Sequence, residues 1–356
     1  ESGWRRAATG TAMLVGVVLL TSVTGPPEAK PFPGGWRPLI IGYFENGWSE
    51  VFGDSFPALQ RHAEQIDIVM PFWYSIHPSG DIEDRGARPE VVEFAHSQGM
   101  LVAPLVNNAK IGTTAAFLVD PAAREEAARV LRRIVDEMGY DGVHMDFERI
   151  PARWREEYTS FIAEIKAALG PGKHLSVAVF PQVDVPEAIS GAHDYAALAG
   201  LSDFIVLMGY DRHWAGGTPG PVSPYDWIER NINYALFDQG VPADKLALAV
   251  GGYGYDWPRG GGRATVVPSR LAPSLAARRG ATVEFDSESR NPHFTYYDGS
   301  VRHDVWFQDE RVMAQRIAQA REHKLIGLAI WRLGYETPQT WTVLRGEVGL
   351  RAGPGR

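Results

Sequence analysis

The feature that most constrains the fold of this chain is a repeated alternation of short apolar runs with amphipathic segments. Eight runs read as buried strands: PLIIGYFE, IDIVMPFWY, LVAPLVNN, GVHMDFE, HLSVAVFP, DFIVLMGY, KLALAVGGY and IGLAIWRL. Between them, apolar residues recur at i, i+3, i+4 and i+7, most clearly over residues 127–138 and 154–169. In a chain of 356 residues, this predicts the α/β class and a closed (β/α)8 TIM barrel. The alternative is an open doubly wound sheet, but no glycine-rich phosphate fingerprint follows the first strand.

One connection is too long to be a barrel loop. About 50 residues separate the seventh strand, ending near Tyr255, from the helix that begins near Asp309. This stretch contains two strand-like pieces, ATVEF and HFTYYD, and structureless loops of such length are uncommon. We therefore predict a small inserted α+β subdomain between strand 7 and helix 7, over residues 258–305. The barrel domain is expected to span residues 37–350, followed by a tail over 351–356.

The first 36 residues are excluded from the predicted fold. Arg5 and Arg6 precede TAMLVGVVLLTSV, an apolar run that is short for a ~30 Å hydrocarbon core. A basic flank followed by such a run is typical of an export signal, although SVTG is a poor cleavage site. We expect a signal peptide, or an uncleaved signal anchor that holds the chain at a membrane. The following GPPEAKPFPGG reads as a Pro/Gly linker.

Composition excludes several classes of function. The formal net charge is −8, without a basic patch, so no nucleic-acid partner is expected. Cysteine is absent, so neither disulfides nor cysteine metal sites are possible. We expect no cofactor, and a monomer.

The segment DGVHMDFE, residues 141–148, is the strongest candidate for chemistry. His144, Asp146 and Glu148 alternate with three apolar residues, so in a barrel strand they point inward while the apolar residues face the helices. They rise toward the carboxyl end of the strand, where barrel enzymes keep their sites. Because buried carboxylates are costly unless they are paired or used, packing alone explains them poorly. Two alternatives remain: an inward network that only holds the barrel together, and a metal site with three ligands.

These residues and four other motifs resemble glycoside hydrolase family 18, the chitinase family. DGVHMDFE is similar to the family signature DGxDxDxE, and MGYD at 208–211 to its MxYD motif on strand six. Trp331, in GLAIWRLGYE, matches the tryptophan that ends strand eight in the family. GYGYDW at 252–257 and GTPGPVSPYDW at 217–227 resemble the bacterial spore-germination, cortex-lytic branch. The likeness covers the chain from about residue 38 to residue 345.

The resemblance implies retaining hydrolysis in which the 2-acetamido group of the substrate acts as the nucleophile. Glu148 would be the general acid and then the base, with a pKa above the ~4.3 of a free glutamic acid. Asp146 would bind the acetamido N–H, and Tyr210 the acetamido oxygen. Trp331 would lie under the sugar ring. Met208, the strand neighbour of Tyr210, faces inward by the period of two.

His144 departs from the family pattern, which has aspartate at this position. The departure puts in doubt the sharing of a proton with Asp146, but not the role of Glu148. Further candidates for sugar contacts lie at strand ends, and each could instead make an ordinary hydrogen bond at the barrel rim: Tyr43, Asn107, Asn108, Asp211 and His213. Trp306 and Tyr297, in or near the insertion, could line the cleft or pack the subdomain.

Two hypotheses follow from the resemblance. The first is a secreted or membrane-anchored glycosidase of the bacterial cell envelope, acting on glycans with 2-acetamido sugars, either peptidoglycan or a chitin-like polymer. The second is a lectin-like barrel that binds sugars without cleaving them. Because lectins of the family commonly lose the terminal glutamate, the presence of Glu148 favours the enzyme.

Overall fold

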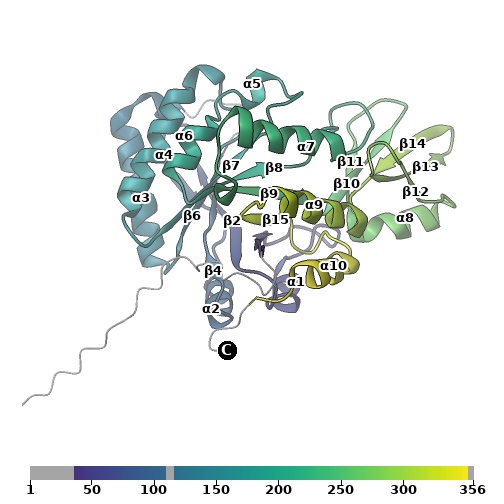
Figure 1. The fold of residues 1–356 in the computed structure, drawn as a ribbon, viewed down its shortest axis with the longest axis horizontal. Helices are drawn as coiled ribbons and strands as arrows, with labels where there is room; N and C mark the ends of the chain where they lie inside the picture. The colour runs from purple at the N-terminus through teal and green to yellow at the C-terminus, as the bar shows by residue number, and fades with distance from the viewer. Residues whose placement is uncertain (1–35, 110–115, 352–356) are drawn as a thin grey trace, which may run out of the picture.

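The computed structural model describes residues 36–109 and 116–351, and it confirms the closed parallel barrel (Figure 1). The strands follow the order β1-β15-β9-β8-β7-β6-β5-β2, and pairing of β1 with β2 closes the ring. The barrel strands are β1 (Leu39–Phe44), β2 (Ile68–Ile76), β5 (Leu105–Asn108), β6 (Gly142–Asp146), β7 (His174–Val179), β8 (Phe204–Met208), β9 (Leu246–Gly251) and β15 (Gly327–Trp331). Two short strands, β3 (Ile82–Asp84) and β4 (Leu101–Val102), also pair with β2.

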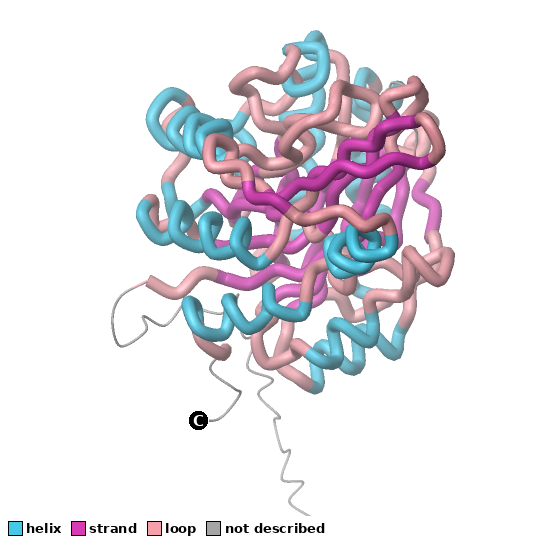
Figure 2. The backbone as a smooth tube through the Cα atoms, turned by 90° about the vertical axis from the view of Figure 1, so that its right-hand side faces the viewer, coloured by secondary structure: helices cyan, strands magenta, loops and turns pink. Residues whose placement is uncertain are grey.

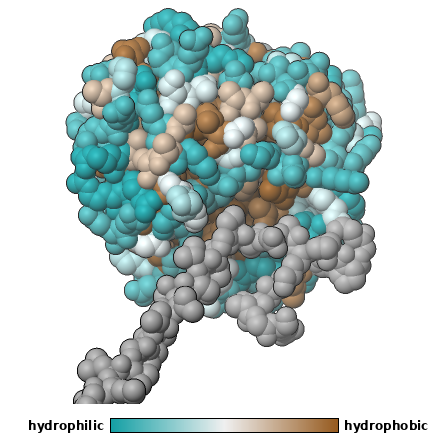
Figure 3. Space-filling model, turned by 60° about the vertical axis from the view of Figure 1, so that its left-hand side comes forward, coloured by the Kyte–Doolittle hydropathy of each residue, from teal (hydrophilic) through white to brown (hydrophobic). Residues whose placement is uncertain are grey.

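Each barrel strand is followed by a helix that packs on the outside of the ring. These helices are α1 (Phe56–Arg61), α2 (Pro89–Ser97), α3 (Pro121–Glu137), α4 (Arg155–Leu169), α6 (Tyr195–Leu201), α7 (Tyr225–Asn233), α9 (Glu310–Glu322) and α10 (Pro338–Val348). A short helix, α5 (Glu187–Ser190), precedes α6. Aspartate side chains begin three of the helices by accepting backbone N–H groups, as Asp120 does at α3. The predicted stripes are the buried faces of α3 and α4. The face of the molecule seen in Figure 3 is mostly hydrophilic, with smaller apolar areas.

The barrel has one core inside the ring and a larger one between the ring and its helices. The inner core consists of Leu39, Ile41, Tyr43, Ile68, Met70, Ala103, Leu105, Phe204, Val206, Ala247, Ala249 and Ala329. On β6 the two cores alternate along the strand, because successive side chains point to opposite faces. Val143, Met145 and Phe147 belong to the outer core, whereas His144 faces the interior and contacts Tyr43 of β1.

The insertion is a second, antiparallel sheet between β9 and α9, at the right of Figure 1. Its order is β11-β10-β14-β13-β12, with helix α8 packed against it. The elements are β10 (Tyr253–Pro258), β11 (Thr265–Pro268), α8 (Ala272–Arg278), β12 (Glu284–Phe285), β13 (Pro292–Asp298) and β14 (Val301–Trp306). The expected boundary at residue 258 is therefore too late, since β10 begins at Tyr253. The run KLALAVGGY reads as one strand, but β9 ends at Gly251. A Cβ on the next residue, Gly252, would lie 2.9 Å from the backbone nitrogen of Glu336, which is too close for a side chain.

The described chain enters and leaves the barrel on the same face. Trp36 donates to the carbonyl of Leu325, just before β15, and the backbone N–H of Arg351 donates to Glu64, just before β2. This is the face at the amino ends of the barrel strands. Figure 2 shows helices, in cyan, around the strands, in magenta. The expected signal or anchor and its linker, up to residue 35, lie outside the described residues, as do residues 352–356 of the expected tail. Over 36–109 and 116–351, no helix has the length and apolarity needed to cross a membrane.

Candidate active site

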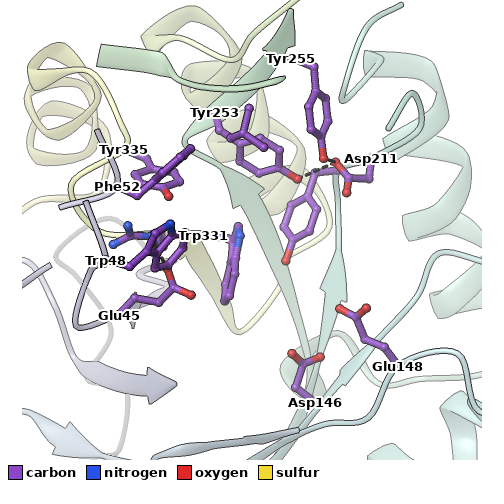
Figure 4. A pocket seen from close by; sticks show the side chains of 13 residues that line it. Glu45, Trp48, Phe52, Asp146, Glu148, Asp211, Tyr253, Tyr255, Trp331 and Tyr335 are labelled. Carbon is purple, nitrogen blue, oxygen red and sulfur yellow. Dashed lines mark hydrogen bonds and ion pairs between the residues drawn. The ribbon is translucent and has the colours of Figure 1, made fainter. Parts of the chain in front are cut away.

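A cavity of about 280 Å³ opens at the carboxyl ends of the barrel strands. Asp146, Glu148, Tyr210, Asp211 and Trp331 all line it, so five of the predicted site residues are brought together from β6, β8 and β15. The rest of the lining consists of Glu45, Trp48, Phe52, Tyr253, Tyr255, Val266, Arg332 and Tyr335. In Figure 4 the carboxylates of Asp146 and Glu148 border the same space as the indole of Trp331.

The two carboxyl groups on β6 are held in an environment that favours protonation. Both keep part of their surface open to the cavity, while protein surrounds them on the other sides. The pKa of Glu148 is raised to about 8, first by burial and then by the negative charges of Asp146 and Asp211, against a smaller opposing effect of Arg149. Burial also raises the pKa of Asp146. The pair therefore retains a proton near neutral pH, as a general acid requires.

The end of β6 is fixed from both sides by hydrogen bonds to its backbone. The Asn108 side chain accepts from the N–H of Glu148 at 3.0 Å and donates to its carbonyl at 2.9 Å. His193 donates from Nε2 to the carbonyl of Phe147 at 3.0 Å, because its Nδ1 accepts from the N–H of Phe180. Asn108 was predicted as a possible sugar contact, but the structure places it behind Glu148, where it orients the strand end.

One oxygen of Asp146 is left without a partner. Oδ1 is buried and has no hydrogen bond within the described part of the chain. A buried acceptor without a donor is costly, so the position suits a ligand N–H. Near it, the backbone at Arg149 and Asp211 adopts positive φ angles of 53° and 62°. Non-glycine residues rarely take this conformation, and such strain is concentrated at functional sites.

His144 does not join the two carboxylates in one cluster. Its Nε2 lies 2.9 Å from the hydroxyl of Tyr43 and its Nδ1 2.8 Å from Ser176, which in turn lies 2.9 Å from Nε2 of His174. Nδ1 of His174 is 3.5 Å from the carboxylate of Asp203, which can only accept. Tyr43, His144, Ser176 and His174 are thus linked in one buried chain of hydrogen bonds. Burial lowers the pKa of His144 to about 3, so the imidazole is neutral.

The arrangement gives little support to the metal alternative. Across residues 36–109 and 116–351, no group of three His, Asp or Glu side chains is placed to hold a metal ion. Both nitrogens of His144 already have protein partners, and Asp146 and Glu148 face a different space.

The remaining predicted residues lie outside the lining of the cavity. Met208 and Tyr43 are buried, and the Tyr43 ring supports Trp331 edge-on at 5.2 Å between centroids. Asn107 accepts from Ser75 at 2.6 Å. His213 contacts the carbonyl of Thr218. Trp306 stacks on His293 at 4.4 Å, and Tyr297 is exposed on the insertion.

The structure adds two groups that were not predicted. Tyr253 and Tyr255, from the insertion, both donate to Oδ1 of Asp211, at 2.6 and 2.9 Å. On the opposite wall, Glu45 is paired with Arg332 at 2.6 Å. Glu45 lies on the same face of its strand as Tyr43, so the period of two could have identified it. The contact of Tyr253 and Tyr255 with Asp211, which we call the tyrosine clamp, depends on how the insertion packs on the barrel, and no local sequence pattern predicts this packing.

Trp48, Phe52 and Tyr335 complete the wall around this pair. The guanidinium of Arg332 lies 4.0 Å from the ring of Tyr335 and 5.4 Å from that of Trp48, which stacks on Phe52. A cis peptide joins Trp331 to Arg332. The cavity thus combines aromatic surface with a few fixed polar groups, which is the composition of sugar-binding sites.

Comparison with known proteins agrees with this geometry. The family model described as "Glycosyl hydrolases family 18" matches residues 109–336. The putative sporulation-specific glycosylase YdhD of Bacillus subtilis is 30% identical over 80% of this chain and 70% of its own length. The cortical fragment-lytic enzyme of Bacillus anthracis is 29% identical over 69% of this chain, but the match spans only 59% of that enzyme.

Solved structures show the same fold. The spore cortex-lytic enzyme SleL of Bacillus megaterium has a TM-score of 0.78 and 25% identity, covering 89% of this chain and 75% of that one. A chitinase from Chromobacterium violaceum has a TM-score of 0.80 at 24% identity, covering 88% of this chain and 100% of that one.

Proposed function

Since the chain belongs to glycosyl hydrolase family 18 and is a glycoside hydrolase, we propose that it is an exported, retaining enzyme that cleaves β-linked glycans containing N-acetylglucosamine by substrate-assisted catalysis. One observation carries the proposal. At the end of β6, a carboxyl group whose pKa is raised stands beside a carboxylate oxygen that has no hydrogen-bond partner among the described residues. The first group suits proton donation, and the second suits the N–H of an acetamido group.

In the first half of the reaction, Glu148 donates its proton to the glycosidic oxygen while the acetamido oxygen of the same sugar attacks the anomeric carbon. The bond to the leaving sugar breaks and an oxazolinium ion forms. Oδ1 of Asp146 accepts from the acetamido N–H, and its negative charge stabilises the developing cation. The hydroxyl of Tyr210 donates to the acetamido oxygen and holds it in line. Trp331 supports the sugar ring from below.

In the second half, the carboxylate of Glu148 takes a proton from water. The oxygen of that water attacks the anomeric carbon, and the oxazolinium ring opens to restore the acetamido group. Two successive inversions give net retention. The other carboxylates in the cavity support a mechanism without an enzyme nucleophile. Asp211 accepts from two tyrosines, and Glu45 is paired with Arg332.

For the substrate, both peptidoglycan and chitin-like polymers fit this mechanism, since both contain 2-acetamido sugars. The names of the relatives point to the bacterial envelope: cortical fragment-lytic enzymes and a sporulation glycosylase. We propose secretion or anchoring outside the cell on the same basis, together with the basic and apolar segment near residues 5–23.

The test uses products and stereochemistry together. Purified protein is incubated with peptidoglycan strands and with chitin oligomers, and the fragments are identified by mass. An NMR time course on N-acetylated and fully deacetylated oligomers then follows the anomeric signals. Cleavage of the acetylated oligomers alone, with the β-anomer formed first, is expected. Equal cleavage of both, or an α-anomer first, would overturn the substrate-assisted mechanism.

The same assay separates the lectin alternative and the metal alternative. A lectin would bind the oligomers without releasing fragments. Prolonged EDTA treatment is expected to leave turnover unchanged, because the chemistry assigned to these residues uses only protein groups and the substrate. Loss of turnover that zinc or another divalent ion restores would contradict this expectation.

A further inference from the structure

A second cavity is lined mainly by residues that follow Glu148 directly in the chain. It has a volume of about 680 Å³, and its lining consists of Arg149, Pro151, Ala152, Arg153, Glu187 and Ala188. These residues follow the carboxyl ends of β6 and β7, so the cavity is on the same face of the barrel as the site. The two arginines outnumber the single carboxylate of Glu187.

Within residues 36–109 and 116–351, neither arginine has a carboxylate partner. Nearby Arg155 pairs with Asp194 at 3.1 Å, whereas neither Arg149 nor Arg153 has a carboxylate oxygen within 4.0 Å in the described parts of the chain. The guanidinium of Arg149 lies 5.6 Å from the ring of Trp214, and that of Arg153 lies 5.0 Å from the ring of Trp154. Aromatic faces position the two cations and leave their N–H groups available.

Arg149 is unfavourable in two ways, through its backbone conformation and through its effect on the pKa of Glu148. Its backbone has a positive φ of 53°, which an arginine rarely adopts. Its charge also lowers the pKa of Glu148, against the effect of burial, and so opposes the protonated form that an acid needs. A cation that works against the acid beside it calls for another role, and binding an anion is the role its free N–H groups suit.

The direction in which the glycan runs through the site determines which part of it carries that anion. The oxygen that Glu148 protonates joins the retained sugar to the leaving one. In the proposed mechanism the acetamido group of the retained sugar lies at Asp146 and the bond to the leaving sugar lies at Glu148. The leaving sugar then extends past Glu148, toward Arg149 and Arg153, which follow it in the chain. Groups carried by that sugar therefore meet the second cavity.

We propose that Arg149 and Arg153 form a binding site for a carboxylate on the leaving part of the glycan, so that the enzyme prefers acidic 2-acetamido glycans, such as peptidoglycan strands with lactyl or peptide carboxylates, over neutral chitin. This proposal rests on the proposed function, because it takes the direction of the substrate from the roles of Glu148 and Asp146. In a chain with a net charge of −8, a local pair of cations is needed to hold such an anion.

Binding is measured first, by calorimetry in the Glu148→Gln background, so that no turnover interferes. Three oligomers of equal length are compared: a peptidoglycan strand with free lactyl carboxylates, the same strand with these groups converted to methyl amides, and a chitin oligomer. The tighter binding of the carboxylate form is expected to weaken with added salt. The double variant Arg149→Gln with Arg153→Gln should bind the carboxylate oligomer about tenfold or more weaker. Its affinity for each of the two neutral oligomers should stay within about twofold of the parent value.

Arg133→Gln is the matched control, because Arg133 is an exposed arginine on α3, outside the site. It should change none of the three affinities. Equal affinity of the parent for the carboxylate and amide forms, or an equal loss for all three oligomers in the double variant, would overturn the proposal. Hydrolysis assays with the native enzyme test the anion site and the proposed hydrolysis separately. Cleavage without any charge preference refutes only the anion site, and charge-dependent binding without cleavage refutes only the hydrolysis.

Discussion

At the scale of single residues, the site depends on how protein surroundings change the proton affinity of three neighbours on one strand. Burial raises the pKa of the carboxyls of Asp146 and Glu148, and lowers that of the imidazole of His144. The direction differs because burial disfavours the charged form in each case. One strand thus carries an acid that stays protonated and a base that stays neutral.

The Glu148→Gln variant keeps the shape of the side chain but has no acidic proton. General acid catalysis contributes ~10²–10⁴-fold, so turnover should fall by at least about a hundredfold while affinity for the glycan persists. Steady-state rates and calorimetry on the same oligomer measure the two effects. Activity close to that of the native enzyme would mean that another group donates the proton.

His144 is expected to remain neutral over the whole range in which the enzyme is assayed. Because burial lowers its pKa to about 3, its ring signals in NMR should not shift between pH 5 and pH 8. The free amino acid histidine, followed in the same buffers, serves as the comparison, since an unperturbed imidazole titrates near ~6.5. A midpoint for His144 near 6 would show that it shares a proton with its neighbours after all.

At the scale of elements, β6 ends in a carboxylate whose backbone is held by the adjacent strand. Asn108 ends β5 and makes two hydrogen bonds to the backbone of Glu148, and the two strands are paired from Leu105 to Asn107. Parallel pairing therefore continues as a side-chain clamp beyond the last residue of β6. Its effect should be on orientation, because Asn108 does not line the cavity.

Asn108→Ala removes the clamp and leaves the cavity wall intact. A displacement of the acid by about 1 Å can cost ~10²-fold, so kcat should fall by about ten- to a hundredfold with little change in KM. Asn108→Asp restores one acceptor for the N–H of Glu148 and should recover part of the loss if it folds. A change confined to KM would instead show that Asn108 touches the sugar.

Much of the barrel and of the candidate site could be predicted from the sequence, because both follow from local patterns. A period of two put Asp146 and Glu148 on the inner face of β6, and strand direction put them at the same end as Trp331 of β15. The tyrosine clamp on Asp211 could not be predicted, since it depends on how the inserted sheet packs on the barrel. The pairing of Glu45 with Arg332 also joins residues nearly 300 positions apart, for which no spacing rule exists.

At the scale of the whole molecule, the buried ionisable groups act on stability in opposite directions. The neutral histidines 144, 174 and 193 have lowered pKa values, so the unfolded chain binds more protons and stability falls as the pH drops below about 6.5. For Glu148 the pKa is raised in the folded protein, so the folded state holds a proton that the unfolded chain has lost. Its contribution makes stability fall as the pH rises from about 4.5 to about 8.

Glu148→Gln should therefore be more stable than the native protein, by an amount that grows with pH. The histidine contributions are common to both proteins and cancel in the difference. We expect similar melting temperatures at pH 5 and a Tm higher by at least ~2 °C for the variant at pH 8. Thermal scans across this range measure it. A difference that does not change with pH would mean that Glu148 ionises freely in the folded enzyme.

Trp36 and Arg351 lie at the amino ends of the barrel strands, and this position determines the orientation of the enzyme when it is attached to a surface through either of them. Both lie on the base of the barrel, whereas the catalytic cavity opens at its mouth. Anything joined to either point, whether a bead, a fused domain or a lipid surface, holds the molecule by its base and leaves the mouth facing outward. The length of such a linker would then set how far the enzyme reaches into a polymer network. It would not change which face of the enzyme meets the glycan.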